Sequence, residues 1–230
     1  EFNDNKFAVP EDATGPEADL RREFYRSTGI NLLYSEILSR EYVGLDAYGE
    51  EIWKEDMRLF KLAHIDIVTL NVFSWAMLQP DEATYDFTKL DKIMDMVEDN
   101  HLKVCLATST AVHPAWMARR YPDVLRTEHN GMKRKFGSRH NSCPNSPTYR
   151  KYSVALARHL AKRYGNRENV VAWHVSNEYG GECYCENCEK AFRVWLKKKY
   201  GTIEELNRVW NLSFWGHTMY DCCLLYTSDA

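Results

Sequence analysis

The sequence predicts an α/β protein in which the strands of a parallel sheet alternate with helices. Runs of branched apolar residues recur along the chain, and segments with apolar residues at helical spacing follow them. Such alternation implies parallel strands joined by right-handed crossovers. An open doubly wound sheet and a closed barrel both satisfy it, but the glycine-rich fingerprints of nucleotide-binding open sheets are missing. A barrel needs about 250 residues and about eight units. We count four units at most, so the pattern predicts half a barrel.

The composition limits the class of protein. The chain has 230 residues, of which 44% are hydrophobic and 13% aromatic, which is enough for one domain with a large core. A net charge of -3 argues against nucleic acid or an anionic membrane as the main partner. No apolar run reaches the roughly 18 residues of a membrane span, and no signal-peptide pattern opens the chain. We therefore expect a cytoplasmic protein without a membrane partner.

The first part of the chain is weakly patterned. Residues 1–28 mix charged residues, proline and glycine without periodicity, so we expect a poorly ordered leader. A first strand is expected at Gly29–Tyr34. A helix is expected from Glu50, with an apolar stripe formed by Trp53, Met57 and Phe60. A strand at Ile65–Leu70 follows it.

The middle of the chain repeats the alternation and then breaks it. A helix is expected from Asp86, with an inner face of Leu90, Ile93, Met94 and Val97. The next strand is expected at Lys103–Thr108. The connection Ser109–Ser146 is far longer than a usual strand-to-helix loop and is rich in aromatic and basic residues. Loops of this length are functional or disordered, and this composition favours a functional one.

The last units are the most clearly marked. Pro147 is well placed to open a helix at Tyr149–Tyr164. A strand begins at Val170, and a helix is expected at Glu189–Tyr200 with Phe192, Trp195 and Leu196 facing inward. Thr202 has a glutamate three residues on, which is the pattern of a capping box that opens a short helix.

The strand that begins at Val170 leads into the most informative stretch of the chain. Its near-continuous apolar run is typical of a strand covered on both faces. Asn177 and Glu178 follow where this strand ends, which is the end of a barrel where catalytic groups collect. Glu178 is therefore a catalytic candidate, although a glutamate at this position can also simply cap a loop.

Cysteines form a dense cluster directly beyond Glu178. Of the seven cysteines, Cys183, Cys185 and Cys188 lie within six residues, a pattern that fits reduced thiols on a metal better than a disulfide framework. Tetrahedral zinc needs a fourth ligand, and Cys143 is the best candidate because its loop leaves the same end of the sheet. Four thiolates leave no open coordination position, so such a zinc would brace the loops. The alternative is a set of unrelated thiols.

Glu178 suits general acid/base chemistry. Glycoside hydrolysis with retention of configuration requires two carboxyl groups about 5 Å apart, one a proton donor and the other a nucleophile. Asn177 is placed to hold a sugar hydroxyl beside the reacting carbon. Arg139 is a candidate to orient carboxylates or bind hydroxyls, although a lone arginine on a loop is more often a solvated charge.

Several segments together resemble one enzyme family. FSWAMLQPDEATYDF, LATSTAVHPAW, YPDVLR, FGSRHNSCPNSPTYRKYS and the long stretch from VVAWHVSNEYGG to SFWGHT are similar to the N-terminal catalytic domain of the family 42 glycoside hydrolases, the β-galactosidases. The resemblance covers roughly Ile52 to Thr218, and the combination of NEYG with the cysteine cluster is highly specific.

The resemblance implies a TIM (β/α)8 barrel, of which about the first four βα units are present at residues 29–220. It implies an acid/base glutamate after the fourth strand and a nucleophile glutamate after the seventh. Glu178 falls on the acid/base, Asn177 on its substrate-binding neighbour and Arg139 on a substrate-contacting arginine. The cysteines that fall on the zinc ligands of many members are Cys143, Cys183, Cys185 and Cys188. Members are commonly homotrimers that hydrolyse terminal β-D-galactosyl residues.

Three departures from the family pattern set further expectations. The seventh strand lies beyond the units counted here, so we expect the nucleophile to be absent and this chain to be inactive by itself. Residues 35–49 do not match the family motif, and a local frameshift is our hypothesis for them. Residues 221–230 are expected to be a non-native tail.

Two other functions stay open on the sequence alone. One is a related retaining glycosidase, such as a β-glucosidase or an arabinosidase, since an Asn-Glu pair after the fourth strand is widely shared in this superfamily. The other is a non-catalytic, zinc-braced module that binds sugar or a partner protein.

Overall fold

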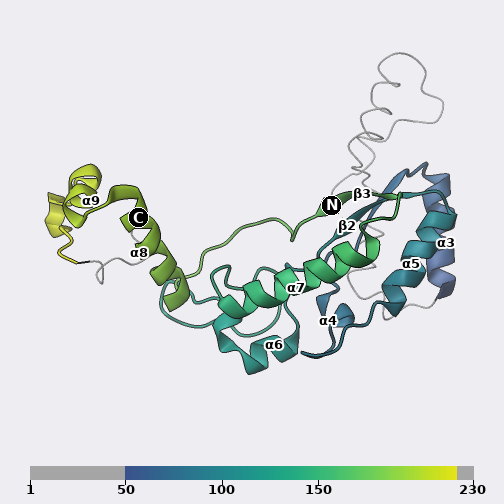
Figure 1. The fold of residues 1–230 in the computed structure, drawn as a ribbon, viewed down its shortest axis with the longest axis horizontal. Helices are drawn as coiled ribbons and strands as arrows, with labels where there is room; N and C mark the ends of the chain where they lie inside the picture. Colours follow the sequence, from purple (N-terminus) through teal and green to yellow (C-terminus); the bar gives the residue numbers. More distant parts are fainter. Residues whose placement is uncertain (1–49, 222–230) are drawn as a thin grey trace, which may run out of the picture.

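The described part of the chain is built around a small parallel sheet. The computed structural model describes residues 50–221. Its strands are β1 (Ile67–Leu70), β2 (Lys103–Ala107) and β3 (Val170–His174), in the order β1-β2-β3. All are parallel, and Figure 1 shows β2 and β3 side by side. Leu70 lies opposite Leu106, and Ala107 lies opposite His174. They are the second, third and fourth strands expected from the sequence, so the alternating pattern is confirmed.

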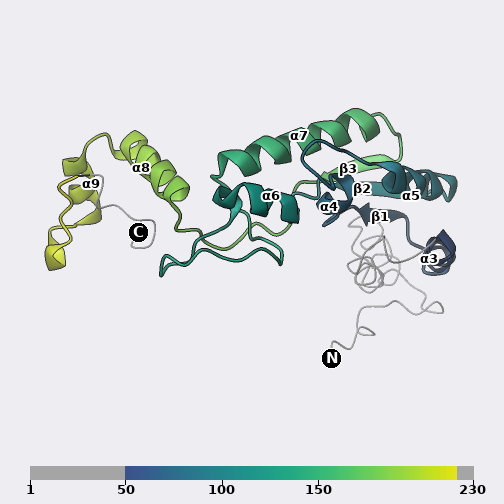
Figure 2. The same ribbon diagram turned by 90° about the horizontal axis from the view of Figure 1, so that it is seen from below.

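Three amphipathic helices pack against this sheet and follow one another around it (Figure 2). They are α3 (Glu50–Leu62), α5 (Thr88–Asp99) and α7 (Pro147–Tyr164). The expected inner faces are confirmed, because the apolar stripes are buried in one core with alternate residues of β1 and β2: Trp53, Met57, Phe60, Val68, Leu70, Leu90, Ile93, Met94, Val97, Val104, Leu106, Tyr152, Leu156 and Leu160.

Side-chain acceptors just before α5 and α7 help to fix where these helices begin. In α5, Asp86 lies just outside the helix, and its Oδ1 accepts a hydrogen bond from the Thr88 N–H at 2.9 Å. In α7, Pro147 is the first residue and the Ser146 hydroxyl oxygen accepts from the Tyr149 N–H at 3.0 Å. A side-chain acceptor at this position satisfies one of the unpaired N–H groups of the first turn. The helices therefore begin within two residues of the positions expected from the sequence.

The prediction that the strand at Val170 is covered on both faces is wrong. In β3 and the residue that follows it, Val171 is 51% exposed, Trp173 37% and Val175 60%. The helix after β3 does not cover them, because α8 (Glu186–Tyr200) lies at the end of an extended segment away from the sheet (Figures 1 and 2). An apolar run predicts that a strand can be buried, but the next helix decides whether it is.

Helix α8 packs instead with α9 (Ile203–Trp210), and they share a small core around Leu196 and Leu206. Leu196 faces this core as expected, whereas Trp195 is 48% exposed, contrary to its predicted inward position. Only half of the expected capping box forms at α9. The Thr202 hydroxyl oxygen accepts from the Glu205 N–H at 3.2 Å, but the Glu205 carboxylate pairs with Arg208.

Short helices lie in the long connections at the carboxyl ends of β1 and β2: α4 (Trp75–Leu78), α6 (Ala115–Arg120) and η2 (Pro122–Val124). A further short helix, η3 (Phe214–Gly216), follows α9. Glu82, in the loop after β1, ties this region together by accepting hydrogen bonds from the hydroxyls of Tyr152 and Tyr121 and pairing with Arg120. These contacts, with the Tyr152 hydroxyl first, lower the pKa of Glu82 to about 2. The carboxylate therefore stays charged and holds the loop against α6 and α7.

Some expectations concern residues outside the described range. The leader at 1–28, the strand at Gly29–Tyr34, the departure at 35–49 and all but the first residue of the tail at 221–230 belong to this part of the chain. Within residues 50–221, no helix has both the length and the apolar character that crossing a membrane requires.

Candidate active site and metal centre

Each parallel strand is followed by a polar residue in the left-handed region. Asn71 follows β1 with φ 69°, Ser109 follows β2 with φ 59°, and Ser176 follows β3 with φ 61°. Residues other than glycine rarely adopt this conformation, which costs on the order of 1 to 3 kcal/mol each and concentrates at functional sites. His64 and His101, before β1 and β2, share this conformation, so strain alone does not mark the site. The carboxyl edge is the candidate site because catalytic groups of a barrel collect there.

Hydrogen bonds between neighbouring strand ends fix the turn that follows β3. The Thr108 N–H donates to the His174 carbonyl at 3.1 Å, and the Ser176 N–H donates to the Thr108 hydroxyl oxygen at 2.9 Å. Thr108 is itself hydrogen bonded to Thr110 at 2.9 Å. The backbone just before Asn177 is therefore attached to the end of β2, which limits where the next side chains can point.

Glu178 and Arg139 meet across the candidate site. Arg139 Nη1 lies 2.8 Å from Glu178 Oε2, and the two side chains are 45% and 66% exposed. Exposed pairs of this kind contribute about 0 to 1 kcal/mol. Both partners are nevertheless held in costly backbone: Glu178 has φ 35°, and Arg139 lies between Ser138 and His140, with φ 64° and 58°. The ion pair therefore joins two segments with unfavourable backbone although it contributes little stability itself.

Asn177 offers an unused donor beside this carboxylate. Its Nδ2 atom is buried and has no hydrogen-bond partner among the described residues. Leaving a buried donor unpaired costs about 1 to 3 kcal/mol, so each such group calls for a partner that the protein atoms do not supply. Asn177 stays a predicted substrate-binding residue, and a partner for its Nδ2 group would have to come from outside the described residues.

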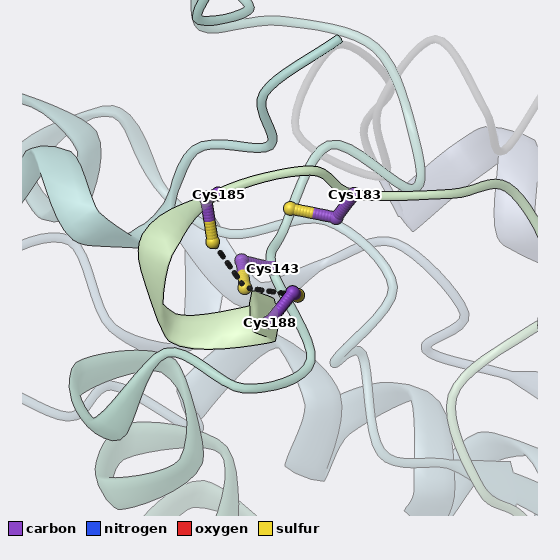
Figure 3. A group of neighbouring side chains, drawn as sticks. All are labelled: Cys143, Cys183, Cys185 and Cys188. Atoms are coloured by element: carbon purple, nitrogen blue, oxygen red, sulfur yellow. Dashed lines mark hydrogen bonds between the residues drawn. The ribbon is translucent and has the colours of Figure 1, made fainter. Parts of the chain in front are cut away.

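The four cysteines named from the sequence come together at one point. The sulfur atoms of Cys143, Cys183, Cys185 and Cys188 all lie within 4.8 Å of one another. The Cys143 sulfur lies 3.4 Å from that of Cys185 and 3.5 Å from that of Cys188 (Figure 3). Tetrahedral zinc, with bonds of about 2.3 Å, separates its sulfur ligands by about 3.8 Å. The group could therefore hold one metal ion.

The chemistry of the cluster also suits a cation. Interaction with the Cys143 thiol lowers the pKa of Cys183 well below its usual value, while the pKa of Cys143 is raised in return. The Asn145 Nδ2 group donates to the Cys188 sulfur at 3.4 Å. A thiolate and an amide donor of this kind are typical of metal sites and their outer shells. Cys143 belongs to the loop of Arg139, Cys183 and Cys185 belong to the segment between Glu178 and α8, and Cys188 lies in the first turn of α8. A metal here would therefore join the two loops and the start of α8.

A buried histidine lies beneath the Arg139 loop. His113 is 2% exposed, and its Nδ1 lies 2.7 Å from the Ser142 hydroxyl. Burial lowers the pKa of His113 to about 4, from an ordinary value of 6.5. The folded protein therefore holds this ring neutral, while the unfolded chain begins to take up a proton below about pH 6.5.

This difference predicts an acid-sensitive contribution to stability. Above about pH 6.5 His113 is neutral in both the folded and the unfolded protein. As the pH falls toward 4, only the unfolded chain takes up the proton, so the free energy of unfolding should fall by up to about 3 kcal/mol. In His113→Gln, which is neutral throughout, the fall in unfolding free energy between pH 7 and 4.5 should be smaller. Urea unfolding of both proteins at each pH measures this, and the shared thiols and carboxylates cancel in the difference. Equal pH dependence of the two proteins would exclude the effect.

Sequence reasoning missed two features of the site. The left-handed residues that follow the strands carry no sequence signal, because asparagine and serine occur in many loops. Arg126 was also missed, although its side chain reaches both site loops through the carbonyls of Ser142 and Gly180. A single arginine within a long loop reads as a solvated charge, and only its burial distinguishes it.

Solved structures define the class of fold. The crystal structure of β-galactosidase from Bacillus circulans sp. alkalophilus matches with TM-score 0.76 and 60% sequence identity, covering 79% of this chain and 27% of that chain. The cold-adapted β-galactosidase from Rahnella sp. R3 matches with TM-score 0.77 and 38% identity, covering 81% of this chain and 27% of that chain. The sheet and its helices are therefore part of a TIM (β/α)8 barrel.

Sequence comparison identifies the family. The glycoside hydrolase 42 family, described as "Beta-galactosidase", matches residues 45–222. The β-galactosidase BgaP of Planococcus sp. (strain L4) is 64% identical over 172 residues, covering 75% of this chain and 25% of the relative. The chain belongs to the glycoside hydrolase 42 family, as its motifs indicated. It spans about a quarter of the length of such relatives.

Proposed function

We propose that this chain supplies the acid/base half of a retaining β-galactosidase active site that cleaves terminal β-D-galactosyl residues. The observation that carries the proposal is the placement of Glu178, paired with Arg139 at 2.8 Å, beside the unpartnered amide of Asn177 at the end of β3. Membership of a β-galactosidase family supports the choice of sugar. Residues 29–220 would form the N-terminal half of the barrel.

The proposed mechanism has two displacements. In the first, the protonated Glu178 carboxyl donates its proton to the glycosidic oxygen as the bond from the anomeric carbon to that oxygen breaks. A second carboxylate, outside the residues described here, forms a bond to the same carbon. In the second displacement, Glu178, now a carboxylate, takes a proton from water as the water attacks this carbon and releases the second carboxylate. Asn177 would hold a sugar hydroxyl, and Arg139 would orient Glu178.

We further propose that the metal of the cysteine cluster is zinc. Four thiolates are the donor set that structural zinc prefers, and they leave no position for water or substrate. The residues that would hold it are Cys143, Cys183, Cys185 and Cys188. When bound, the metal would brace the two loops without taking part in proton transfer. We propose the cytoplasm as the location, because its reducing conditions keep such thiols reduced. We also propose a homotrimer that acts on galactosides, which only the family resemblance supports.

The alternatives are separated by substrate choice. We expect a chimera in which residues 50–221 replace the matching segment of the 64% identical relative to hydrolyse p-nitrophenyl β-D-galactoside at a rate near that of the parent enzyme. Its activity on the β-D-glucoside and the α-L-arabinoside should be at least about tenfold lower, since a site that hydrogen-bonds a sugar hydroxyl discriminates against its loss or inversion. A preference for either rival sugar would change the assigned substrate. Sugar binding without turnover, in a folded chimera, would favour the non-catalytic module.

A further inference from the structure

Arg126 is a buried cation placed between the two loops of the candidate site. The residue is 7% exposed. The Nε–H group donates to the Ser142 carbonyl at 3.0 Å, in the loop that carries Arg139. The Nη1–H group donates to the Gly180 carbonyl at 2.8 Å, two residues after Glu178. One guanidinium group therefore binds the backbone of both loops.

The partners of Arg126 are unusual for a buried charge. Buried arginines normally pair with a carboxylate, because removing an unpaired charge from water is costly. Among the ion pairs formed within residues 50–221, none involves Arg126, and its side chain donates to neutral carbonyl oxygens. A charged donor strengthens each of these hydrogen bonds to roughly twice that of a neutral pair. The buried charge of Arg126 therefore holds the backbone at Ser142 and Gly180 in place.

The backbone beside Arg126 reinforces the same connection. The Cys143 N–H donates to the Val124 carbonyl at 2.7 Å, and the Arg126 N–H donates to the Asn141 carbonyl at 3.2 Å. On the other side, the Tyr184 N–H donates to the Thr127 carbonyl at 3.0 Å. The segment 124–127 therefore lies between the two loops like a short central strand, and the Arg126 side chain adds the contact nearest to Glu178.

A glycine allows this close contact. Gly181 has φ 73°, and a Cβ atom there would lie 2.4 Å from Arg126 Nη1. Any larger residue would meet both a strained backbone and the guanidinium group. The glycine therefore leaves room for the Arg126 guanidinium group next to the Gly180 carbonyl that it binds.

We propose that Arg126 is a positioning residue for acid/base catalysis, which couples the metal-braced loop of Arg139 to the loop of Glu178. This inference rests on the proposed function. Arg126 touches neither substrate nor reacting atoms; it fixes the carbonyl of Gly180, and through it the direction of the Glu178 carboxyl. Its loss should therefore harm the proton transfer more than sugar binding.

The leaving group of the substrate separates positioning from mere stability. In the chimera, Arg126→Gln should lower kcat/KM for lactose, whose leaving group needs a proton, by about 100-fold. For 2,4-dinitrophenyl β-D-galactoside, whose leaving group departs without a proton, the loss should be less than about fivefold. Arg126→Lys keeps the charge but not the forked pair of donors. Its kcat/KM for lactose should therefore lie between that of the unsubstituted chimera and that of Arg126→Gln. Equal losses on both substrates would mean that the residue only maintains the fold, and the inference would be wrong.

A matched control and a second measurement complete the test. Arg134→Gln removes an arginine of the same loop whose side chain pairs with Glu128 at the surface, and it should leave both rates unchanged. Amide hydrogen exchange of the 230-residue chain should become faster at 140–143 and 178–184 in Arg126→Gln, and stay unchanged in Arg134→Gln. If the unsubstituted chimera is inactive, the proposed function fails, and the exchange experiment still decides the contact: unaltered exchange in both loops would overturn it.

Discussion

Replacing Glu178 by alanine in the chimera is expected to lower kcat/KM for lactose by about 10²-fold to 10⁴-fold, the usual contribution of a general acid. For the dinitrophenyl galactoside the loss in kcat/KM should be far smaller, because that leaving group needs no proton. Its kcat should still fall, since Glu178 also activates the water of the second step. Steady-state kinetics with the two substrates measures both effects.

Glu182 supplies the matched control for this prediction. It is an exposed glutamate in the same segment as Glu178, and its carboxylate accepts a hydrogen bond from the Tyr184 hydroxyl. Glu182→Gln should leave both substrates within about twofold of the unsubstituted chimera, since single surface changes rarely exceed about 0.5 kcal/mol. If Glu178→Ala retained full activity on lactose, or lost activity equally on both galactosides, Glu178 would not be the acid.

Cys143→Ser is expected to cause a large loss of stability. Cys143 is fully buried, and its sulfur lies within 3.5 Å of those of Cys185 and Cys188. It is the member of the cluster that comes from the Arg139 loop, so the link between the two loops depends on it. A metal present at 100 times its dissociation constant stabilises the folded state by about 2.7 kcal/mol. Loss of one thiolate should remove most of that amount, together with the bound metal.

Metal content and unfolding test this directly. The unsubstituted 230-residue chain should carry one zinc ion per molecule by elemental analysis, and a chelator should lower its melting temperature. Cys143→Ser should lack the metal, and the chelator should not change its melting. Cys105→Ser is the control, because Cys105 is a free cysteine in β2 outside the cluster. A metal-free chain that ignores the chelator, or metal retained in Cys143→Ser, would contradict the four-thiolate site.

The fold could be predicted from the sequence wherever one periodicity decided the outcome. The apolar spacing of Leu90 and Leu156 indicated the inner faces of α5 and α7, because a stripe of this kind must be buried somewhere. The position of α8 could not be predicted this way. Its own stripe is satisfied by packing with α9, so Val171 and Trp173 of β3 stay exposed although their sequence is that of a buried strand.

The candidate site divides in a similar manner. Cys143 lies 40 residues before Cys183, yet it could be assigned to the same cluster from the sequence. Thiolates bind the same kinds of metal, and the loops after neighbouring parallel strands meet at one end of the sheet. Arg139 was a candidate to orient carboxylates, but nothing in the sequence distinguished this from a solvated charge, and the structure pairs it with Glu178. Arg126 could not be found from the sequence at all, because its role depends on burial and on carbonyl groups that every residue carries. Side chains that bind backbone leave no pairwise signal in a single sequence.

One product decides the role of Glu178 most directly. In Glu178→Ala, the dinitrophenyl galactoside should still form the galactosyl-enzyme, and added azide should then attack from the face that the leaving group vacated. The account predicts β-D-galactosyl azide, identified by the anomeric proton in NMR. The α anomer would contradict it, because azide would then have replaced a missing nucleophile, and Glu178 would be that nucleophile rather than the acid/base.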